Sequence, residues 1–414
     1  MHPEQSSPAG GALDGLLVVD ATQMLAGPLC ATRLGDLGAD VIKVEAPVGG
    51  EFNRTHGFND ATFGGDMTTF LAVNRNKRSV ALDLKSQGGL EAFRDLIARA
   101  DVFVQNFRHG TAERLGIGYD ALRQVNPRLV YCSVSGYGPT GPYRDRPGQD
   151  LIVQGYSGSM FSVGKAGDPP TAGALWAADV MTGYQAAIGI LAALSARQRT
   201  GEGQHVQVDM FSVVLDAQLQ ELVTYLNTGE QPTRKEEPTA HASIPAPYGV
   251  YQTADGWLTL AMSPLPVLGG LLDDPWLRTL THYNDGQTQR DEVYRHLRDR
   301  FLSATTAEWI ERCDRHGVWA GPVYDYAGVA SDPHVLATGM LTTQPHPVAG
   351  EVRTARPPLS LSGTPTSIRR GAPPLGADTR DVLHDLLGYD NERITRLAED
   401  RAIGLGSAVE AAAS

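Results

Sequence analysis

The sequence predicts an α/β fold, in which a large Rossmann-like domain with an open parallel sheet carries a smaller inserted α+β domain. Short apolar segments alternate with amphipathic, helix-like segments over residues 14–226, and this alternation is typical of βαβ units with a parallel sheet. A charged, proline-bearing segment at residues 227–247 then marks a linker. The length of 414 residues agrees with two or three domains.

The large domain begins with a predicted strand at residues 16–20, followed by a turn at residues 22–27. Pro28 is expected at the first position of the next helix, where its missing N–H has no intrahelical partner to lose. That helix is expected to end near Gly38. The later predicted strands are residues 41–45, 79–84, 102–105, 129–134 and 203–210. The predicted helices among them are residues 89–100, 111–125 and 211–226.

The longest apolar segment covers residues 174–197 and is expected to form the central helix of the large domain. From residue 180 to residue 196 it is almost wholly small or apolar, with Gln185 as its strongly polar side chain. A helix that is apolar on every side is typical of the interior of a large protein. A membrane span would need about 20 apolar residues, so a span is not predicted here.

The smaller domain is expected at residues 248–340. A hairpin is predicted at residues 248–262 with its turn at Asp255-Gly256, and helices follow at residues 290–303 and 306–316. A second proline-rich segment at residues 342–374 leads back, so that residues 341–403 complete the large domain with a helix at residues 379–387. Residues 404–414 are small and are expected to be a loose tail.

Composition narrows the functional classes. The net charge of −12 argues against nucleic acid and against a basic membrane-binding face. Cys30, Cys132 and Cys313 are widely spaced and odd in number, which excludes a disulfide framework and a CxxC metal site. Residues 2–13 have no apolar core of a signal peptide, so we expect a cytoplasmic protein. The scattered histidines predict no metal site.

Known nucleotide motifs are missing where the fold would need them. The first strand-to-helix turn has one glycine, Gly27, whereas a dinucleotide site requires G-x-G-x-x-G there. We therefore expect no nicotinamide cofactor, although a dinucleotide enzyme stays an alternative. A near-match to a P-loop at Gly158 and Gly164-Lys165 has the wrong spacing, and Ala166 replaces the residue that would hold magnesium.

Asp179 is the candidate functional residue at the start of the central helix. It could cap the helix, because an Asp side chain accepts bonds from the free amides of the first turn. It could also be a nucleophilic carboxylate, placed where helix amides stabilise an oxyanion. The two interpretations are compatible, since a carboxylate has two oxygens.

Eight segments, in order, carry a resemblance to a known family. Examples are NRNKRSVALDLKS at residues 74–86 and PPLGADTRDVLHDLLGY at residues 373–389; the other segments are residues 16–47, 100–122, 126–143, 150–160, 177–210 and 317–340. Together they resemble the class III CoA-transferases, which include formyl-CoA and carnitinyl-CoA transferases and also α-methylacyl-CoA racemases. The resemblance implies a ring-shaped subunit of an interlocked homodimer, and coenzyme A as acyl-CoA substrate and product.

The resemblance also implies the site residues. Asp179 matches the catalytic aspartate, and Gln23 is expected to orient the thioester carbonyl. The implied CoA contacts are Met24, Leu25, Ala26, Lys77, Asn106, Phe107, Thr111, Arg114, Leu115 and Gln149. Arg75, Arg78 and Arg108 add positive charge that could face phosphates, although ordinary surface cations would give the same pattern. Phe107 could stack on adenine or belong to the core.

The implied reaction moves CoA between an acyl-CoA thioester and a free carboxylic acid. Asp179 would form an acyl anhydride and then an aspartyl-CoA thioester. A racemase of the same family, or a non-catalytic acyl-CoA-binding protein, stays an alternative.

Three positions depart from the family pattern. Gln149 stands where racemases carry a histidine base, and an amide cannot accept a proton from carbon near neutral pH. Ala46 replaces an arginine, and Gly269-Gly270 is the closest match to the glycine-rich lid of formyl-CoA transferase.

Overall fold

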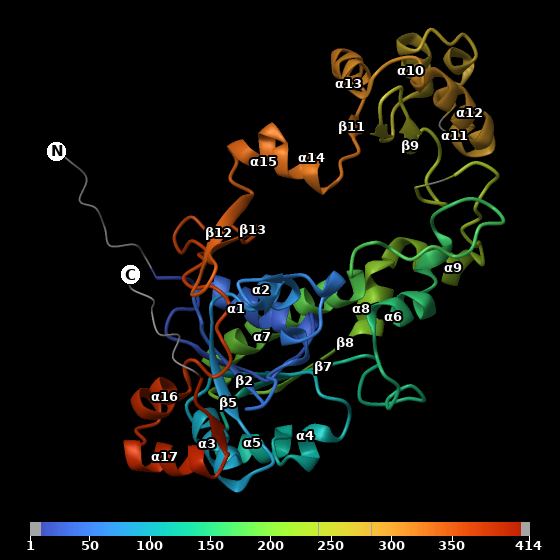
Figure 1. The fold of residues 1–414 in the computed structure, drawn as a ribbon. Coiled ribbons are helices and arrows are strands. Elements are labelled where there is room, and N and C mark those ends of the chain that lie inside the picture. The colour runs from blue at the N-terminus through green and yellow to red at the C-terminus, as the bar shows by residue number, and fades with distance from the viewer. Residues whose placement is uncertain (1–9, 239, 283, 407–414) are drawn as a thin grey trace. The chain divides into compact units, whose positions relative to one another are not determined.

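The computed structural model describes residues 10–406 except residues 239 and 283. The chain divides into two compact units (Figure 1). Unit 1 consists of the chain up to Val153, Trp176–Val214 and the chain from Leu336 onward, and unit 2 consists of Gln154–Leu175 and Leu215–Val335. The sequence predicted the first part of the large domain at residues 14–226 and a linker at residues 227–247, whereas the contacts assign residues 154–175 and 215–247 to unit 2.

Unit 1 contains a seven-stranded sheet in the order β14-β5-β2-β1-β6-β7-β8. Its strands are β1 (Leu17–Asp20), β2 (Asp40–Glu45), β5 (Lys77–Leu82), β6 (Val102–Gln105), β7 (Val130–Ser135), β8 (His205–Asp209) and β14 (Ile403–Gly404). Every pairing is parallel except that of β14, which runs antiparallel to β5 at one edge. The predicted parallel α/β fold is therefore confirmed. The tail was expected to be loose from residue 404, but Gly404 belongs to β14; residues 407–414 lie outside the described residues.

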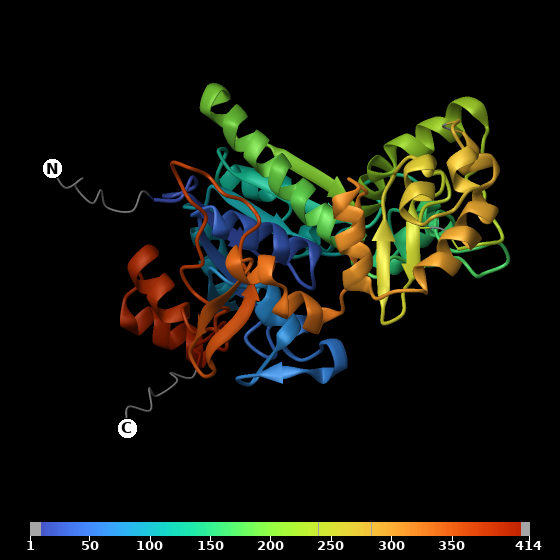
Figure 2. The ribbon, with the colours of Figure 1, turned by 90° about the horizontal axis from the view of Figure 1, so that it is seen from above.

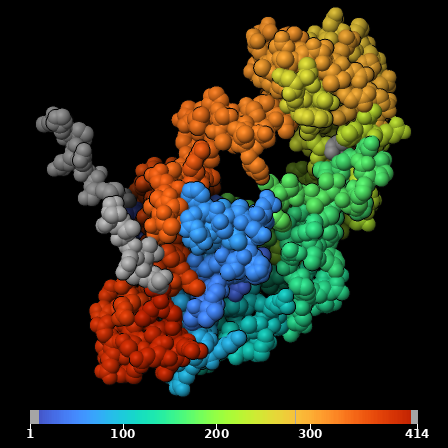
Figure 3. Space-filling view, viewed as in Figure 1, coloured from blue at the N-terminus to red at the C-terminus, as the bar shows by residue number. Residues whose placement is uncertain are grey.

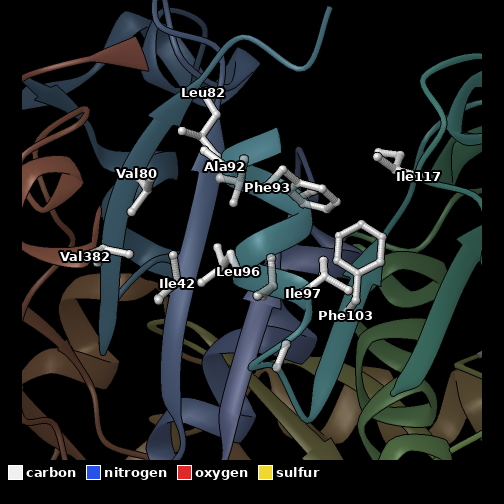
Figure 4. Packing of buried hydrophobic residues seen from close by; sticks show 14 of the residues in the cluster. Ile42, Val80, Leu82, Ala92, Phe93, Leu96, Ile97, Phe103, Ile117 and Val382 are labelled. Atoms are coloured by element: carbon white, nitrogen blue, oxygen red, sulfur yellow. The ribbon is translucent and has the colours of Figure 1, made fainter. Parts of the chain in front are cut away.

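Helices cover both faces of this sheet, which explains why all four residues of β1 are buried. One face carries α3 (Gln87–Ile97), α5 (Tyr119–Val125), α17 (Asn391–Glu399) and the π-helical turn η5 (Val382–Leu386). Figure 4 shows Phe93 and Leu96 of α3 pointing toward Ile42 and Phe103 of the strands. Phe93 and Phe103 pack edge to face with ring centroids 5.4 Å apart.

The other face carries α1 (Ala26–Asp36) and α7 (Ala177–Thr200). Figure 2 shows α7 as the long green helix beside the blue helix α1. Gly183 permits this approach, since a Cβ there would lie 2.7 Å from the carbonyl oxygen of Ala26. Among the described residues, α7 is long and apolar enough to cross a membrane by length and composition alone, a test that core helices of soluble proteins also pass.

Three helix predictions need correction. Helix α1 begins at Ala26, so Pro28 lies at its third position and not at its first. The helix expected at residues 111–125 is divided into α4 (Thr111–Arg114) and α5, because Gly116 takes a left-handed φ of +71° between them. The helix expected at residues 211–226 is divided into α8 (Met210–Ala217) and α9 (Leu219–Thr228).

The proline-rich segment that was expected to be a crossing contains a β-hairpin, β12 (Leu341–His346) and β13 (Gly350–Ala355). Figure 3 shows the part of the chain that follows unit 2, coloured orange to red, packed against the blue N-terminal part. The remaining short elements of the first part of the chain and of its return are η1 (Phe52–Arg54), η2 (Phe58–Asp60), β3 (Thr62–Phe63), β4 (Asp66–Met67), α2 (Thr68–Val73), α6 (Asp150–Ser157), α15 (Pro333–Ala337) and α16 (Thr379–Asp381).

Unit 2 has its own core on a three-stranded antiparallel sheet of β9 (Gly249–Gln252), β10 (Trp257–Leu260) and β11 (Ala320–Pro322). The predicted hairpin is formed by β9 and β10. The further elements are η3 (Ser159–Phe161), α10 (Leu265–Leu271), η4 (Leu277–Thr279), α11 (Asp285–Thr288), α12 (Arg290–Phe301), α13 (Thr306–Arg315) and α14 (Tyr326–Ser331). Gly269 and Gly270 lie within α10 and form no loop. A Cβ on Gly269 would approach the Arg278 nitrogen to 2.6 Å, so this glycine serves close packing.

Candidate active site

The candidate site lies at the carboxyl ends of β1 and β6, where the strand order reverses. From β1 the chain continues to β2 on one side, whereas β6 lies on its other side. Loops that follow such neighbouring strands turn away from each other, and open α/β sheets bind ligands in the space between them. The two loops here are residues 21–25 and residues 106–110.

The turn after β1 is held in one conformation by side chains from two other segments. The Gln23 N–H donates to Asn106 Oδ1 at 2.9 Å, and Asn106 Nδ2 donates back to the Gln23 carbonyl at 2.8 Å. Asn53 Nδ2 donates to the carbonyl of Met24 at 2.6 Å. Met24 has a left-handed φ of +69°, a conformation that a non-glycine residue keeps only when its surroundings enforce it.

A cavity of about 280 Å³ lies beside this turn. It brings together four of the predicted residues: Gln23, Phe107, Thr111 and Leu115. The other lining residues lie at the carboxyl ends of β1, β2 and β5 or in the segments directly after them; they are Ala21, Thr22, Val44, Glu45, Ala46, Gly50, Glu51, Leu82, Asp83, Leu84 and Lys85. Segments that are distant in sequence therefore form one wall at the carboxyl edge of the sheet.

Lys77 does not line this cavity, and the structure gives no support for a contact between its ammonium group and CoA. Its side chain is fully buried, and Nζ donates to Asp20 Oδ2 at 2.8 Å, to the Pro28 carbonyl at 3.0 Å and to Asn74 Oδ1 at 2.9 Å. An ammonium group has three donors, so none is left for a phosphate. Burial raises the pKa of Asp20, but the charges of Lys43 and Lys77 outweigh it and hold that pKa below its usual value.

The two arginines next to Lys77 are also engaged elsewhere. Arg75 is 4% exposed and donates to both oxygens of Asp36, at 2.9 and 2.8 Å. Arg78 pairs with Asp40. The positive cluster expected at residues 75–78 is therefore a set of structural ion pairs.

Two of the three carboxylates in the cavity wall, those of Glu45 and Glu51, are paired as well. Glu45 accepts from Arg54 Nε at 2.6 Å and from Ser79 Oγ at 2.7 Å, and Glu51 pairs with the buried Lys43. Burial raises the pKa of Glu51 despite that charge, because the side chain is almost wholly removed from water. These contacts neutralise an edge that would otherwise repel an anion.

Lys85 is the cation in the cavity wall, and sequence reasoning missed it. It follows β5 and has an exposed side chain. Its position directly after a predicted strand could have indicated this place, because Gln23 also follows a strand and lies at the same edge of the sheet. Arg108 and Arg114 on the segment after β6 are also exposed, and Arg114 donates to Thr111 Oγ1 at 2.8 Å.

Asp179 lies in the first turn of α7, three residues after the N-cap residue Trp176. It is therefore not the N-cap. Its carboxylate accepts a hydrogen bond from the backbone N–H of Ala26, the first residue of α1. Burial raises the pKa of Asp179 from 3.8 to about 6, the charge of Asp150 adds to the rise, and the Ala26 amide opposes it. The buried apolar residues nearby are Val153, Ala178, Met210 and Val214.

Asp150 is a second carboxylate at this site and was not among the predicted residues. It is 1% exposed, and its Oδ1 accepts from the backbone N–H of Asp179 at 3.1 Å. It therefore anchors the first turn of α7. Gln149, the residue before it, is exposed and does not line the cavity.

Removing the charge of Asp150 should make Asp179 more acidic. In Asp150→Asn the amide oxygen still accepts from the Asp179 N–H, but the like charge is gone, so the pKa of Asp179 should fall below about 6. If ionised Asp179 carries the activity, the acid limb of kcat should move to lower pH, with a gain of severalfold at about pH 5. Rate profiles from about pH 4.5 to about pH 8 measure this. An unchanged acid limb in Asp150→Asn would contradict the coupling, and Asp150→Ala should lower kcat at every pH because the helix anchor is lost.

The described residues contain no group of three or more His, Cys, Asp or Glu side chains arranged to hold a metal ion. Their three cysteines are free and buried.

A family model and individual relatives of this chain both point to CoA-transferases. The model of the family described as CoA-transferase family III matches residues 13–379. The beta subunit of succinyl-CoA–L-malate CoA-transferase of Chloroflexus aurantiacus is 38% identical over 400 residues, covering 94% of this chain and 98% of that protein. Human succinyl-CoA:glutarate CoA-transferase is 33% identical over 391 residues, covering 93% and 88%.

A solved structure shows the same fold. The crystal structure of a CaiB/BaiF family protein from Brucella suis aligns with a TM-score of 0.81 at 32% identity. The alignment covers 91% of this chain and all of that one.

Proposed function

The chain belongs to CoA-transferase family III, and we propose that in this CoA-transferase Asp179 carries first the acyl group and then CoA. The observation that carries the proposal is the position of the Asp179 carboxylate. It lies in the first turn of α7, bonded to the Ala26 amide, where burial and the nearby charge of Asp150 raise its pKa to about 6. It is therefore mostly ionised near neutral pH and only weakly solvated, as a nucleophile should be.

The transfer divides into two exchanges at Asp179. The carboxylate attacks the thioester carbonyl; a C–O bond forms, the C–S bond breaks, and CoA leaves as the thiolate with its electron pair. The thiolate then attacks the aspartyl carbonyl of the anhydride, which expels the first acid as its carboxylate. The acceptor carboxylate attacks the resulting thioester, and the released thiolate attacks the new acyl carbonyl, which frees Asp179. No net proton transfer is needed.

Two features of the site favour these steps. The N-terminus of α7 and the Ala26 amide place positive ends of dipoles where a tetrahedral oxyanion would form. The turn that leads into Ala26 has Thr22 and Gln23 in the cavity wall, so the cavity and the Asp179 carboxylate are both in contact with the segment that joins β1 to α1. Holding the reactants together is worth effective molarities of about 10⁵ M or more.

The cavity fits the nucleotide end of CoA. Lys85 lines it, and the exposed Arg108 and Arg114 lie on the segment that supplies Phe107 to the wall. These cations would meet the phosphates of CoA in a chain whose net charge is −12. The ring of Phe107 offers a face for adenine.

We further propose a short dicarboxylic acyl group as substrate, because two of the relatives are named for succinyl-CoA with malate or glutarate. Mass spectrometry tests the proposal, first on the intact protein after incubation with succinyl-CoA, acetyl-CoA or formyl-CoA and then on its proteolytic peptides. A CoA adduct on the peptide that contains Asp179 is the expected result. An adduct elsewhere, or turnover without any adduct under quenched conditions, would refute the covalent route.

We also propose that the protein acts as a homodimer. Leu219, Val223 and Leu226 lie on one stripe of α9 and are 60%, 55% and 68% exposed, and such an apolar stripe is typical of a covered surface. Sedimentation should give twice the chain mass of 44.3 kDa, and Val223→Glu should shift the protein toward monomer. Gln220→Glu, on another side of α9, is the matched control, and a wild-type monomer at micromolar concentration would disprove the dimer.

A further inference from the structure

Three polar side chains on neighbouring strands form a hydrogen-bonded chain that ends at the cavity wall. Gln105 ends β6, Ser133 lies opposite it on β7, and His205 begins β8. Gln105 Nε2 donates to Ser133 Oγ at 3.0 Å, and Ser133 Oγ lies 2.8 Å from His205 Nε2. At its other end, Gln105 Oε1 accepts from the backbone N–H of Phe107 at 2.7 Å. The amide of Gln105 thus connects the sheet to the first residue of the wall segment.

A second anchor comes from Tyr131, also on β7. Its hydroxyl donates to the carbonyl of Ile117 at 3.1 Å and accepts a hydrogen bond from the Gln105 side chain. The side chain is 1% exposed, and its ring meets His205 edge to face with centroids 5.1 Å apart. Tyr119 stacks on that imidazole with ring centroids 4.7 Å apart and also meets the Tyr131 ring edge to face. The anchor is therefore rigidly packed.

The segment between the two anchors, residues 107–117, packs on the core through the buried Ala112 and Ile117 but has little regular structure of its own. Its helix α4 has four residues and no side-chain cap, and the left-handed Gly116 follows it. Isolated turns of this length are unstable in water. Yet this segment supplies Phe107, Thr111 and Leu115 to the cavity, so their placement depends on what holds its ends.

We infer that Gln105 and Tyr131 are positioning residues for acyl-CoA binding, and that Ser133 and His205 orient them. None of the four lines the cavity. They act through the Phe107 N–H and the Ile117 carbonyl, which fix the start and the end of the wall. The inference rests on the proposed function, in which this cavity receives CoA.

Calorimetric titration with CoA, combined with steady-state kinetics on the full chain, tests the inference. Gln105→Leu and Tyr131→Phe should each weaken CoA binding by about tenfold, as expected for losing a buried hydrogen bond that orders a binding segment. KM for acyl-CoA should rise by a similar factor. The value of kcat should stay within about threefold, because α7 and α6 hold Asp179 and this segment does not.

Asn126→Leu is the matched control. Asn126 Nδ2 donates to the carbonyls of Ile97 and Ala100 at 3.0 and 2.7 Å, before the start of β7 and away from the wall. This variant should lower Tm but bind CoA as the wild type does. Equal weakening in Asn126→Leu would overturn the inference, and so would unchanged CoA affinity in both Gln105→Leu and Tyr131→Phe. A wild type that binds no CoA would instead refute the proposed function.

Discussion

Asp179→Asn should abolish transfer while leaving the protein folded and, near neutral pH, more stable. The amide has the same shape and keeps an oxygen for the Ala26 N–H, but it cannot form the anhydride. We expect kcat to fall by roughly 10³-fold or more, the size of loss seen when a covalent catalyst is removed. The CoA adduct on the Asp179 peptide should vanish, while CoA binding by calorimetry should stay within about threefold of the wild type.

The stability gain follows from the pKa of Asp179. The value rises from 3.8 to about 6 on folding, so the folded state binds the proton more tightly than the unfolded chain does. The ionised side chain therefore opposes folding above about pH 6, by about 3 kcal/mol at most. Tm of Asp179→Asn should exceed that of the wild type at about pH 7.5, and the difference should shrink as pH falls toward 3.8.

Asp400→Asn is the matched control, because it also removes one negative charge but at an exposed position after α17. It should alter neither kcat nor Tm. Full turnover in Asp179→Asn would exclude the carboxylate as the carrier. A lower Tm for that variant at about pH 7.5 would show that the carboxylate is not destabilised by its surroundings.

Lys77→Met should unfold the protein more easily without weakening acyl-CoA binding in the molecules that stay folded. The substitution leaves Asp20 with Lys43, whose Nζ is 3.8 Å away, as its remaining cation. Breaking a buried ion pair in this way should lower the free energy of unfolding by about 3–5 kcal/mol. Urea unfolding measures that loss, and KM measured below the transition should be unchanged.

Lys85→Met should have the opposite effects, a higher KM with little change in stability, and serves as the comparison. Its side chain is exposed, so the free energy of unfolding should change by less than about 0.5 kcal/mol. KM for acyl-CoA should rise by about tenfold, because a charged contact to phosphate is lost. If Lys77→Met raises KM and Lys85→Met does not, Lys77 contacts CoA as the resemblance implied. The assignment of that contact to Lys85 would then be wrong.

The sheet of unit 1 was largely predictable, because buried parallel strands are short continuous apolar runs that alternate with amphipathic helices. The segment at residues 102–105 was predicted with its observed bounds. β14 could not be predicted in this way, since Ile403–Gly404 has two residues and pairs with β5, which lies more than 300 positions earlier in the sequence. The hairpin of β12 and β13 was missed because its prolines suggested an irregular crossing.

Part of the candidate site could be predicted from the position of residues along the chain. Gln23, Phe107, Thr111 and Leu115, for which the resemblance implied roles at the CoA site, line one cavity, and their contacts with CoA stay predictions. The burial of Lys77 could not be predicted, because a lysine that begins a strand looks the same in sequence whether its ammonium group reaches water or a buried carboxylate. Asp150 was missed because its partner, the Asp179 N–H, is 29 residues away.

The order in which the two units become complete follows from the pairing of β14 with β5. Every residue of unit 2 has left the ribosome's catalytic centre once Val335 is made, whereas the sheet of unit 1 lacks its edge until Gly404 has been added. Domains fold as units during synthesis, so the inserted unit is free to mature first. The sheet that carries the turn beside Asp179 therefore gains its last edge strand only when some of the last residues have been translated.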